Sequence, residues 1–133
     1  MNRAQLEGAL RVLSKSLGYS FYSLPANRLA EVKQFPAVAL EPPTVSAVVG
    51  RGHGRISYNV TLHILNPAVK LSAQERSNAL HKMETDMMDI FASLSENERV
   101  IVVDDLGITP REYALTNHGE ISQTARAKVV TYY

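Results

Sequence analysis

Cysteine is absent from this chain of 133 residues. Without thiols, the chain has no disulfide, no thiolate nucleophile, no cysteine-ligated zinc and no cysteine-ligated iron–sulfur cluster. A cysteine-free composition also agrees with a reducing compartment. Because a domain of this length buries about two-thirds of its unfolded surface, we expect it to fold without a disulfide or a metal ion.

An excess of charge of one sign is also missing. The chain has 14 lysines and arginines against 13 aspartates and glutamates, for a formal net charge of +1. Proteins that bind duplex DNA usually carry a concentrated basic face, so the composition gives no support for that class.

Long apolar runs are missing as well. No stretch approaches the roughly 18 apolar residues of a membrane-spanning helix. The N-terminal segment is interrupted by Glu7, Arg11 and Lys15, so it lacks the continuous apolar core of a signal peptide. We therefore expect a soluble chain without a membrane partner that is not secreted by a conventional signal.

Two segments have apolar residues at the spacing of an amphipathic helix. The first, about 2–17, is followed by Gly18 at the position of a C-cap glycine. The second, about 73–94, follows Ser72, which has the form of a capping box with Glu75. We expect the second helix to lie on a sheet through Leu80, Met83, Met87, Ile90 or Phe91, and Leu94.

Strand patterns fill much of the remaining chain. Residues 56–64 alternate apolar and polar side chains, which is typical of a strand with one buried face. The final strand is predicted at 121–132, with Ile121, Ala125, Ala127 and Val129 facing inward. Shorter strands are predicted at 37–41, 44–49, 100–103 and 112–116, with turns at 104–107 and 117–119.

The order of these elements predicts the fold class. Residues 19–35 stay open between a strand, an ordered loop and a helical turn. The chain otherwise runs from a helix through several strands to a long helix and further strands, without repeating βαβ units. We expect one α+β domain over 1–133, in which both helices pack on a mainly antiparallel sheet.

Histidines that might bind a metal are dispersed in the sequence. The four residues His53, His63, His81 and His118 are at least ten residues apart and match no metal-binding spacing. Surface histidines are therefore favoured over a metal site, and we predict no metal and no cofactor.

Carboxylates suited to acid–base catalysis are also not paired. Asp104 and Asp105 are neighbours on a strand end, and adjacent strand residues point to opposite faces. Glu84, Asp86 and Asp89 are expected to form a solvated helix flank. We predict no catalytic residue and no enzyme, although a Ser/His/Asp site assembled from distant residues stays open.

A glycine-rich loop at 50–55 reads Gly-Arg-Gly-His-Gly-Arg. It lacks the Gly-Lys-Ser/Thr ending of a phosphate-binding loop, and a strand follows it where that motif needs a helix N-terminus. Two interpretations stay open, a mobile hairpin loop and a loop that contacts a partner or nucleic-acid phosphates.

The layout as a whole resembles tail-terminator and related head–tail joining (neck) proteins of long-tailed phages and prophages. The resemblance rests on the helix at 2–17, the strand Arg-Ile-Ser-Tyr-Asn-Val-Thr-Leu-His-Ile-Leu at 55–65 and the long helix at 72–95. It also includes the Thr-Asn-His-Gly turn at 116–119 and the alternating strand at 121–132. It spans the whole chain as a layout and includes no invariant motif.

The resemblance implies a structural role without chemistry. Proteins of this family are α+β domains that form homo-oligomeric rings, commonly hexamers, on the end of the tail tube. The ring caps the tube and joins it to the head, and DNA passes through without sequence-specific binding. The implied partners are tail-tube and head or neck proteins, and the implied location is the virion, or the bacterial cytoplasm during assembly.

Candidate contact residues follow from this reading. In the loop 50–55, Arg51, His53 and Arg55 are the candidates for an inter-subunit or lumen contact. In the final strand, Arg126, Lys128 and Tyr132 are the candidates for an interface, because an alternating strand has one face to offer a neighbour.

The alternative is a small soluble ligand- or protein-binding module of α+β fold without catalysis. In that case Phe21, Tyr22 or Tyr58 would line a pocket on the sheet face opposite the long helix. A deep apolar pocket with a few converging polar groups would favour this class.

Overall fold

The structure is a computed structural model that describes residues 1–50, 54–111 and 119–133. The order of its elements confirms the predicted succession of helix, strands, long helix and strands. The elements are α1 (Arg3–Ser16), β1 (Ser20–Ser23), the 3₁₀ helix η1 (Ala26–Glu31), β2 (Ala37–Leu40), β3 (Thr44–Val49), β4 (Arg55–Pro67), α2 (Ala73–Ser95), β5 (Val100–Arg111) and β6 (Glu120–Tyr132).

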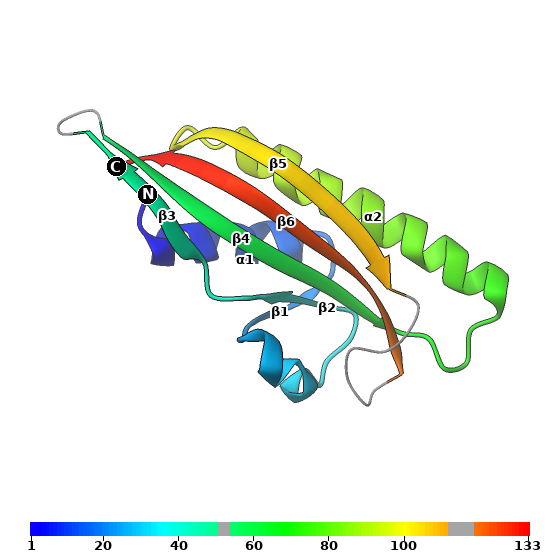
Figure 1. Cartoon of the computed structure of the whole chain (residues 1–133). Helices are drawn as coiled ribbons and strands as arrows, with labels where there is room; N and C mark the ends of the chain where they lie inside the picture. Colours follow the sequence, from blue (N-terminus) through cyan, green and yellow to red (C-terminus); the bar gives the residue numbers. More distant parts are fainter. Residues whose placement is uncertain (51–53, 112–118) are drawn as a thin grey trace.

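The strands form one six-stranded sheet of order β1-β2-β4-β6-β5, and β3 also pairs with β4 (Figure 1). Only β1 and β2 run parallel among the described pairs; the other pairs are antiparallel. The longest ladder joins β4 to β6, from Arg55 opposite Tyr132 to Pro67 opposite Glu120. The α+β class with a mainly antiparallel sheet is therefore confirmed.

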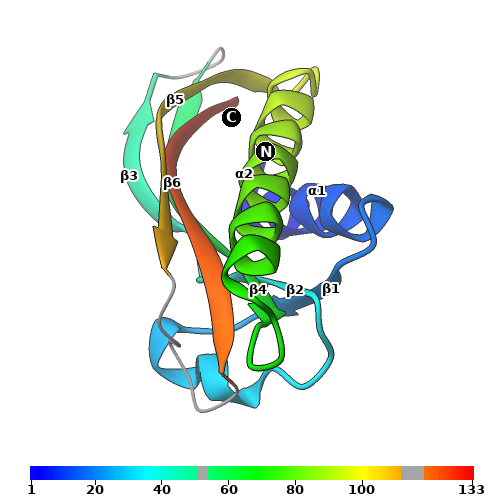
Figure 2. The same ribbon diagram turned by 90° about the vertical axis from the view of Figure 1, so that its right-hand side faces the viewer.

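Both long helices lie on the same face of the sheet, as the two views in Figures 1 and 2 show. We call this the inner face and the opposite one the outer face. We call the half of the sheet that contains β1 and β2 the proximal half, and the half in which β3 pairs with β4 the distal half.

The inner core forms because the apolar side chains along one side of α2 pack against those of β4 and β6. The predicted α2 residues Leu80, Met83, Met87, Ile90, Phe91 and Leu94 are all buried. They pack with strand residues such as Leu62 and Val129 in one cluster. Burying side chains of this size stabilises the fold by about 1.5–3 kcal/mol each.

A second, smaller core lies on the outer face of the proximal half. Successive side chains of a strand point to opposite faces, so Ala37, Ala39 and Leu65 face away from the inner core. Leu29 and Val32, from the segment that contains η1, pack against these three side chains. The segment 24–36 therefore covers the outer face of the proximal half only.

Local capping explains where the helices begin. Ser72 Oγ accepts a hydrogen bond from Glu75 N at 3.2 Å, and Ser72 N donates to Glu75 Oε1 at 3.1 Å. The predicted capping box is thus confirmed. Asn2 and Gln5 form a second box at the start of α1, and Gly18 follows its end with a φ of +91° that suits glycine.

The structure corrects the prediction for the segment after α2. Residues 104–107 do not turn the chain, because β5 runs without a break from Val100 to Arg111. Register shifts at Val100/Val102 and Asp104/Gly107 absorb the extra residues as bulges, and Asp105 has a φ of +56°. The predicted strand at 112–116 and residues 117 and 118 of the predicted turn lie outside the described residues.

Candidate functional site

The distal half of the sheet leaves its outer face uncovered by any described element (Figures 1 and 2). Ala127 and Val129 are buried against the inner core, so their neighbours Arg126, Lys128 and Val130 point to the outer side. We call this surface the open face. It comprises Asn59, Thr61, Val102, Asp104, Asp105, Arg126, Lys128, Val130 and Tyr132.

A shallow concavity of about 290 Å³ lies in the middle of the open face. Side chains of both charges line it, namely Arg126 and Lys128 from β6 and Asp105 from β5, together with the polar residues Asn59 and Thr61 from β4. The bulge in β5 places Asp105 there, because the extra residue re-aims the chain at this point.

The charges of the open face have no ion-pair partner among the described residues. The described pairs join Arg28 to Glu31, His63 to Glu41 and Lys82 to Asp86. None of the pairs includes the cations of β6 or the two aspartates of β5. Arg126 and the two aspartates are exposed and Lys128 is half-buried, so these charges can contact a partner.

One end of the open face is apolar. Val102 and Val130 are opposite each other in the β5–β6 register. Val102 is 37% exposed and Tyr132 is 53% exposed. The open face therefore offers a row of apolar groups next to its charged groups, which is a composition that suits a protein–protein contact.

The residues predicted for contacts are partly brought together. Arg126, Lys128 and Tyr132 share the open face, and Arg55 starts β4 directly opposite Tyr132. Arg51 and His53 lie outside the described residues.

Sequence reasoning missed the role of β5 in this surface. The sequence predicts a turn at Asp104 and Asp105 and gives no sign of their place on a sheet face. An acidic pair followed by Gly107 is also a pattern that a bulge accommodates, because bulges often contain a residue in the left-handed region. Asp105, at φ +56°, is that residue.

His63 corrects the prediction of surface histidines. It is only 5% exposed. Its Nε2 lies 2.7 Å from Glu41 Oε2 and its Nδ1 lies 2.8 Å from Thr124 Oγ1. Burial lowers the pKa of the imidazole from 6.5 despite the neighbouring carboxylate of Glu41.

The linked hydroxyl of Thr124, imidazole of His63 and carboxylate of Glu41 are the same types of group as the catalytic triad of a hydrolase. However, Thr124 is 2% exposed, and the described concavities do not include it among their lining residues. These hydrogen bonds satisfy the polar groups of the buried His63 and Thr124 side chains.

Asp86 is a second correction, because it does not belong to a solvated flank. It is 8% exposed and accepts hydrogen bonds from Tyr19 Oη at 2.5 Å and Lys82 Nζ at 2.7 Å. Burial, followed by the bond to Asp86, raises the pKa of Tyr19. These contacts join the start of β1 to the middle of α2.

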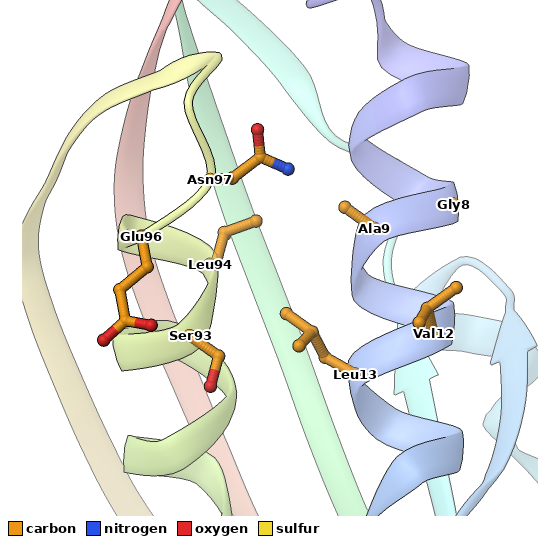
Figure 3. Close-up of a pocket in the computed structure, with 8 residues that line it drawn as sticks. All are labelled: Gly8, Ala9, Val12, Leu13, Ser93, Leu94, Glu96 and Asn97. Atoms are coloured by element: carbon orange, nitrogen blue, oxygen red, sulfur yellow. The ribbon is translucent and has the colours of Figure 1, made fainter.

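A cleft of about 460 Å³ lies between α1 and the end of α2 (Figure 3). Its wall is mainly apolar, with Ala9 and Leu13 on α1 pointing toward Leu94 on α2 (Figure 3). Of the three aromatic residues predicted to line a pocket, Tyr58 is instead buried on the helix side of the sheet. Its hydroxyl donates a hydrogen bond to the backbone oxygen of Met1 at 2.8 Å. Phe21 and Tyr22 do not line the cleft either.

The described residues contain no group of three histidine or acidic side chains placed to hold a metal ion. None of the described helices is both long and apolar enough to cross a bilayer.

Comparison with solved structures finds chains of similar fold. A chain from the structure titled "Virion of native gene transfer agent (GTA) particle" superposes with a TM-score of 0.55 at 11% sequence identity, over 98% of each chain. At this identity the likeness shows a shared fold. No family model and no curated protein matches the sequence.

Proposed function

We propose that this protein is a structural subunit of a phage-like particle. The observation that carries the proposal is the likeness to a virion component over 98% of both chains. A match that leaves almost no residue outside the shared fold fits a subunit of similar size and design. The layout of the sequence points to the same class independently.

Within that class, we propose a tail-terminator or neck subunit that forms a ring, caps the tail tube and joins it to the head. A ring closes through head-to-tail contacts, so each subunit needs two different contact patches. The exposed valines of β3, Val45, Val48 and Val49, supply apolar surface for one such patch.

The test is an assembly experiment. We expect native mass spectrometry and electron microscopy of the purified protein to show closed rings. We also expect the protein to bind one end of tail tubes reconstituted from the tail-tube protein of the same genome. A protein that stays monomeric at high concentration and binds neither tubes nor neck proteins would exclude this role.

The second candidate is a ligand-binding module, and the cleft between α1 and α2 favours it. We expect a fluorescent apolar probe to bind there if this candidate is correct. Ala9→Trp, which fills the cleft, would then abolish binding, while Val69→Trp at an exposed site serves as the control. Equal probe binding by both variants would exclude the cleft as a site.

A further inference from the structure

On the open face, residues that lie opposite each other on β5 and β6 form rows across the two strands. Asp104 lies opposite Lys128, and Val102 lies opposite Val130, in the antiparallel register of the two strands. One row therefore contains an acid and a base, and the next row contains two apolar residues. All four side chains point to the outer side, because Val103 and Val129 between them pack on the inner core.

A simple rotation makes this surface complementary to itself. A two-fold axis that lies in front of the sheet, parallel to the strands and between β5 and β6, places β6 of one copy over β5 of the other. Each row then meets the same row of the second copy. Lys128 of one copy meets Asp104 of the other, and Val130 meets Val102.

We propose that the open face binds the open face of a second copy about this two-fold axis. Each pair contains two Lys128–Asp104 contacts and two Val130–Val102 contacts. Asp105, which the bulge places in the concavity beside Arg126, adds an acidic group near the second cation of β6. The aromatic ring of Tyr132 adds area at the apolar end.

A second copy fits this surface better than nucleic acid does. A phosphate backbone requires cations without intervening acids. On the open face, Asp104 and Asp105 lie beside the cations of β6, so the local charge is balanced. A partner that presents an acid and a base in the reverse order would set opposite charges against this row. A second copy of this chain, rotated about the two-fold axis, presents them in that order.

The proposed contact goes beyond the ring function. A contact in which the same patch is used by both subunits closes with two copies and cannot by itself build a ring. It therefore pairs subunits, or stacks two rings face to face, and it leaves the head-to-tail contact to other surfaces.

The test uses two charge reversals, Lys128→Glu and Asp104→Lys, in separate proteins. Each reversal sets like charges against each other between identical copies, so we expect roughly tenfold weaker self-association for each variant. When the two variants are mixed, the contact between them has opposite charges at both positions. We expect a tagged Lys128→Glu protein to capture untagged Asp104→Lys protein, but not untagged Lys128→Glu protein.

Matched controls carry the same change of charge elsewhere. Lys70→Glu and Glu98→Lys alter exposed residues outside the open face, so both should self-associate like the unaltered protein. Thermal unfolding of every variant checks that the fold is intact. Because the contact involves exposed charges, self-association of the unaltered protein should weaken as salt is added.

Three results would overturn the inference. They are a lack of pairing in the unaltered protein at low salt, failure of the two reversed proteins to capture each other, and equal effects in the control variants. Any of these three results, obtained with proteins that still form rings, would overturn the two-fold contact and leave the ring function standing. Selective capture without any ring would support the contact and count against the ring.

Discussion

The proximal and distal halves of the sheet share β4, β5 and β6 but differ in the other strands that pair with β4 and in the elements that cover them. In the proximal half, helices cover the inner face and the segment 24–36 covers the outer face. In the distal half only the inner face is covered. As a result the polar side of β6 is buried at Ser122 and Thr124 but exposed at Arg126. The difference shows that the elements packed over a strand determine whether its polar side chains are buried or exposed.

The largest effect should come from removing apolar volume under the proximal cover. Leu65 is fully buried in the outer core, so we expect Leu65→Ala to lower the free energy of unfolding by about 2–5 kcal/mol. Val130→Ala, on the open face, should cost less than about 0.5 kcal/mol. Urea unfolding measures both, and similar losses would mean that the two halves do not differ.

A smaller effect should follow from removing a polar partner in the proximal half. Thr124→Val removes the hydroxyl that lies 2.8 Å from His63 Nδ1. A buried group left without its partner costs about 1–3 kcal/mol. Thr61→Val makes the same change on the open face, where we expect less than about 0.5 kcal/mol. If the two variants unfold at the same urea concentration, the buried bond contributes nothing.

The bulge in the distal half offers a test of backbone conformation. Asp105 has a φ of +56°, which is unfavourable for a β-branched residue. We expect Asp105→Val to cost about 1–2 kcal/mol and Asp105→Gly to change stability by less than about 0.5 kcal/mol. Thermal unfolding gives the comparison. A valine variant as stable as the glycine variant would contradict the left-handed conformation.

The smallest effect concerns pH, and it should be confined to the proximal half. Because the folded-state pKa of His63 lies below 6.5, the unfolded chain binds more protons as the pH falls through that value. Stability is therefore fully present above pH 6.5 and declines below it. We expect His63→Gln to reduce this decline and His81→Gln, on the exposed side of α2, to leave it unchanged. Denaturation midpoints at about pH 7.5 and about pH 5 provide the measurement.

Much of the fold can be predicted from local signals. Ser72 and Glu75 mark the start of α2, and the alternation in β4 and β6 gives strands that the structure confirms. These signals need only neighbouring residues. The outward position of Arg126 and Lys128 on β6 can be predicted for the same reason, because the alternation leaves one polar side.

What could not be predicted depends on contacts between distant residues. The burial of His63 requires Glu41 and Thr124, together with the cover from segment 24–36, which has no strong pattern of its own. The continuity of β5 through Asp104 and Asp105 depends on its ladder with β6. Here pairing with a long neighbouring strand overrides the turn preference of the local sequence.

The two bulges of β5 also affect how the protein behaves before it assembles. A long strand at the edge of a sheet is a template for uncontrolled pairing with other chains. In β5 the bulges, the acidic pair at Asp104 and Asp105, and Pro110 all interrupt such pairing. The strand can thus contribute side chains to a specific contact on its face while its backbone resists aggregation, so concentrated protein favours side-chain contacts over open-ended pairing of strand edges.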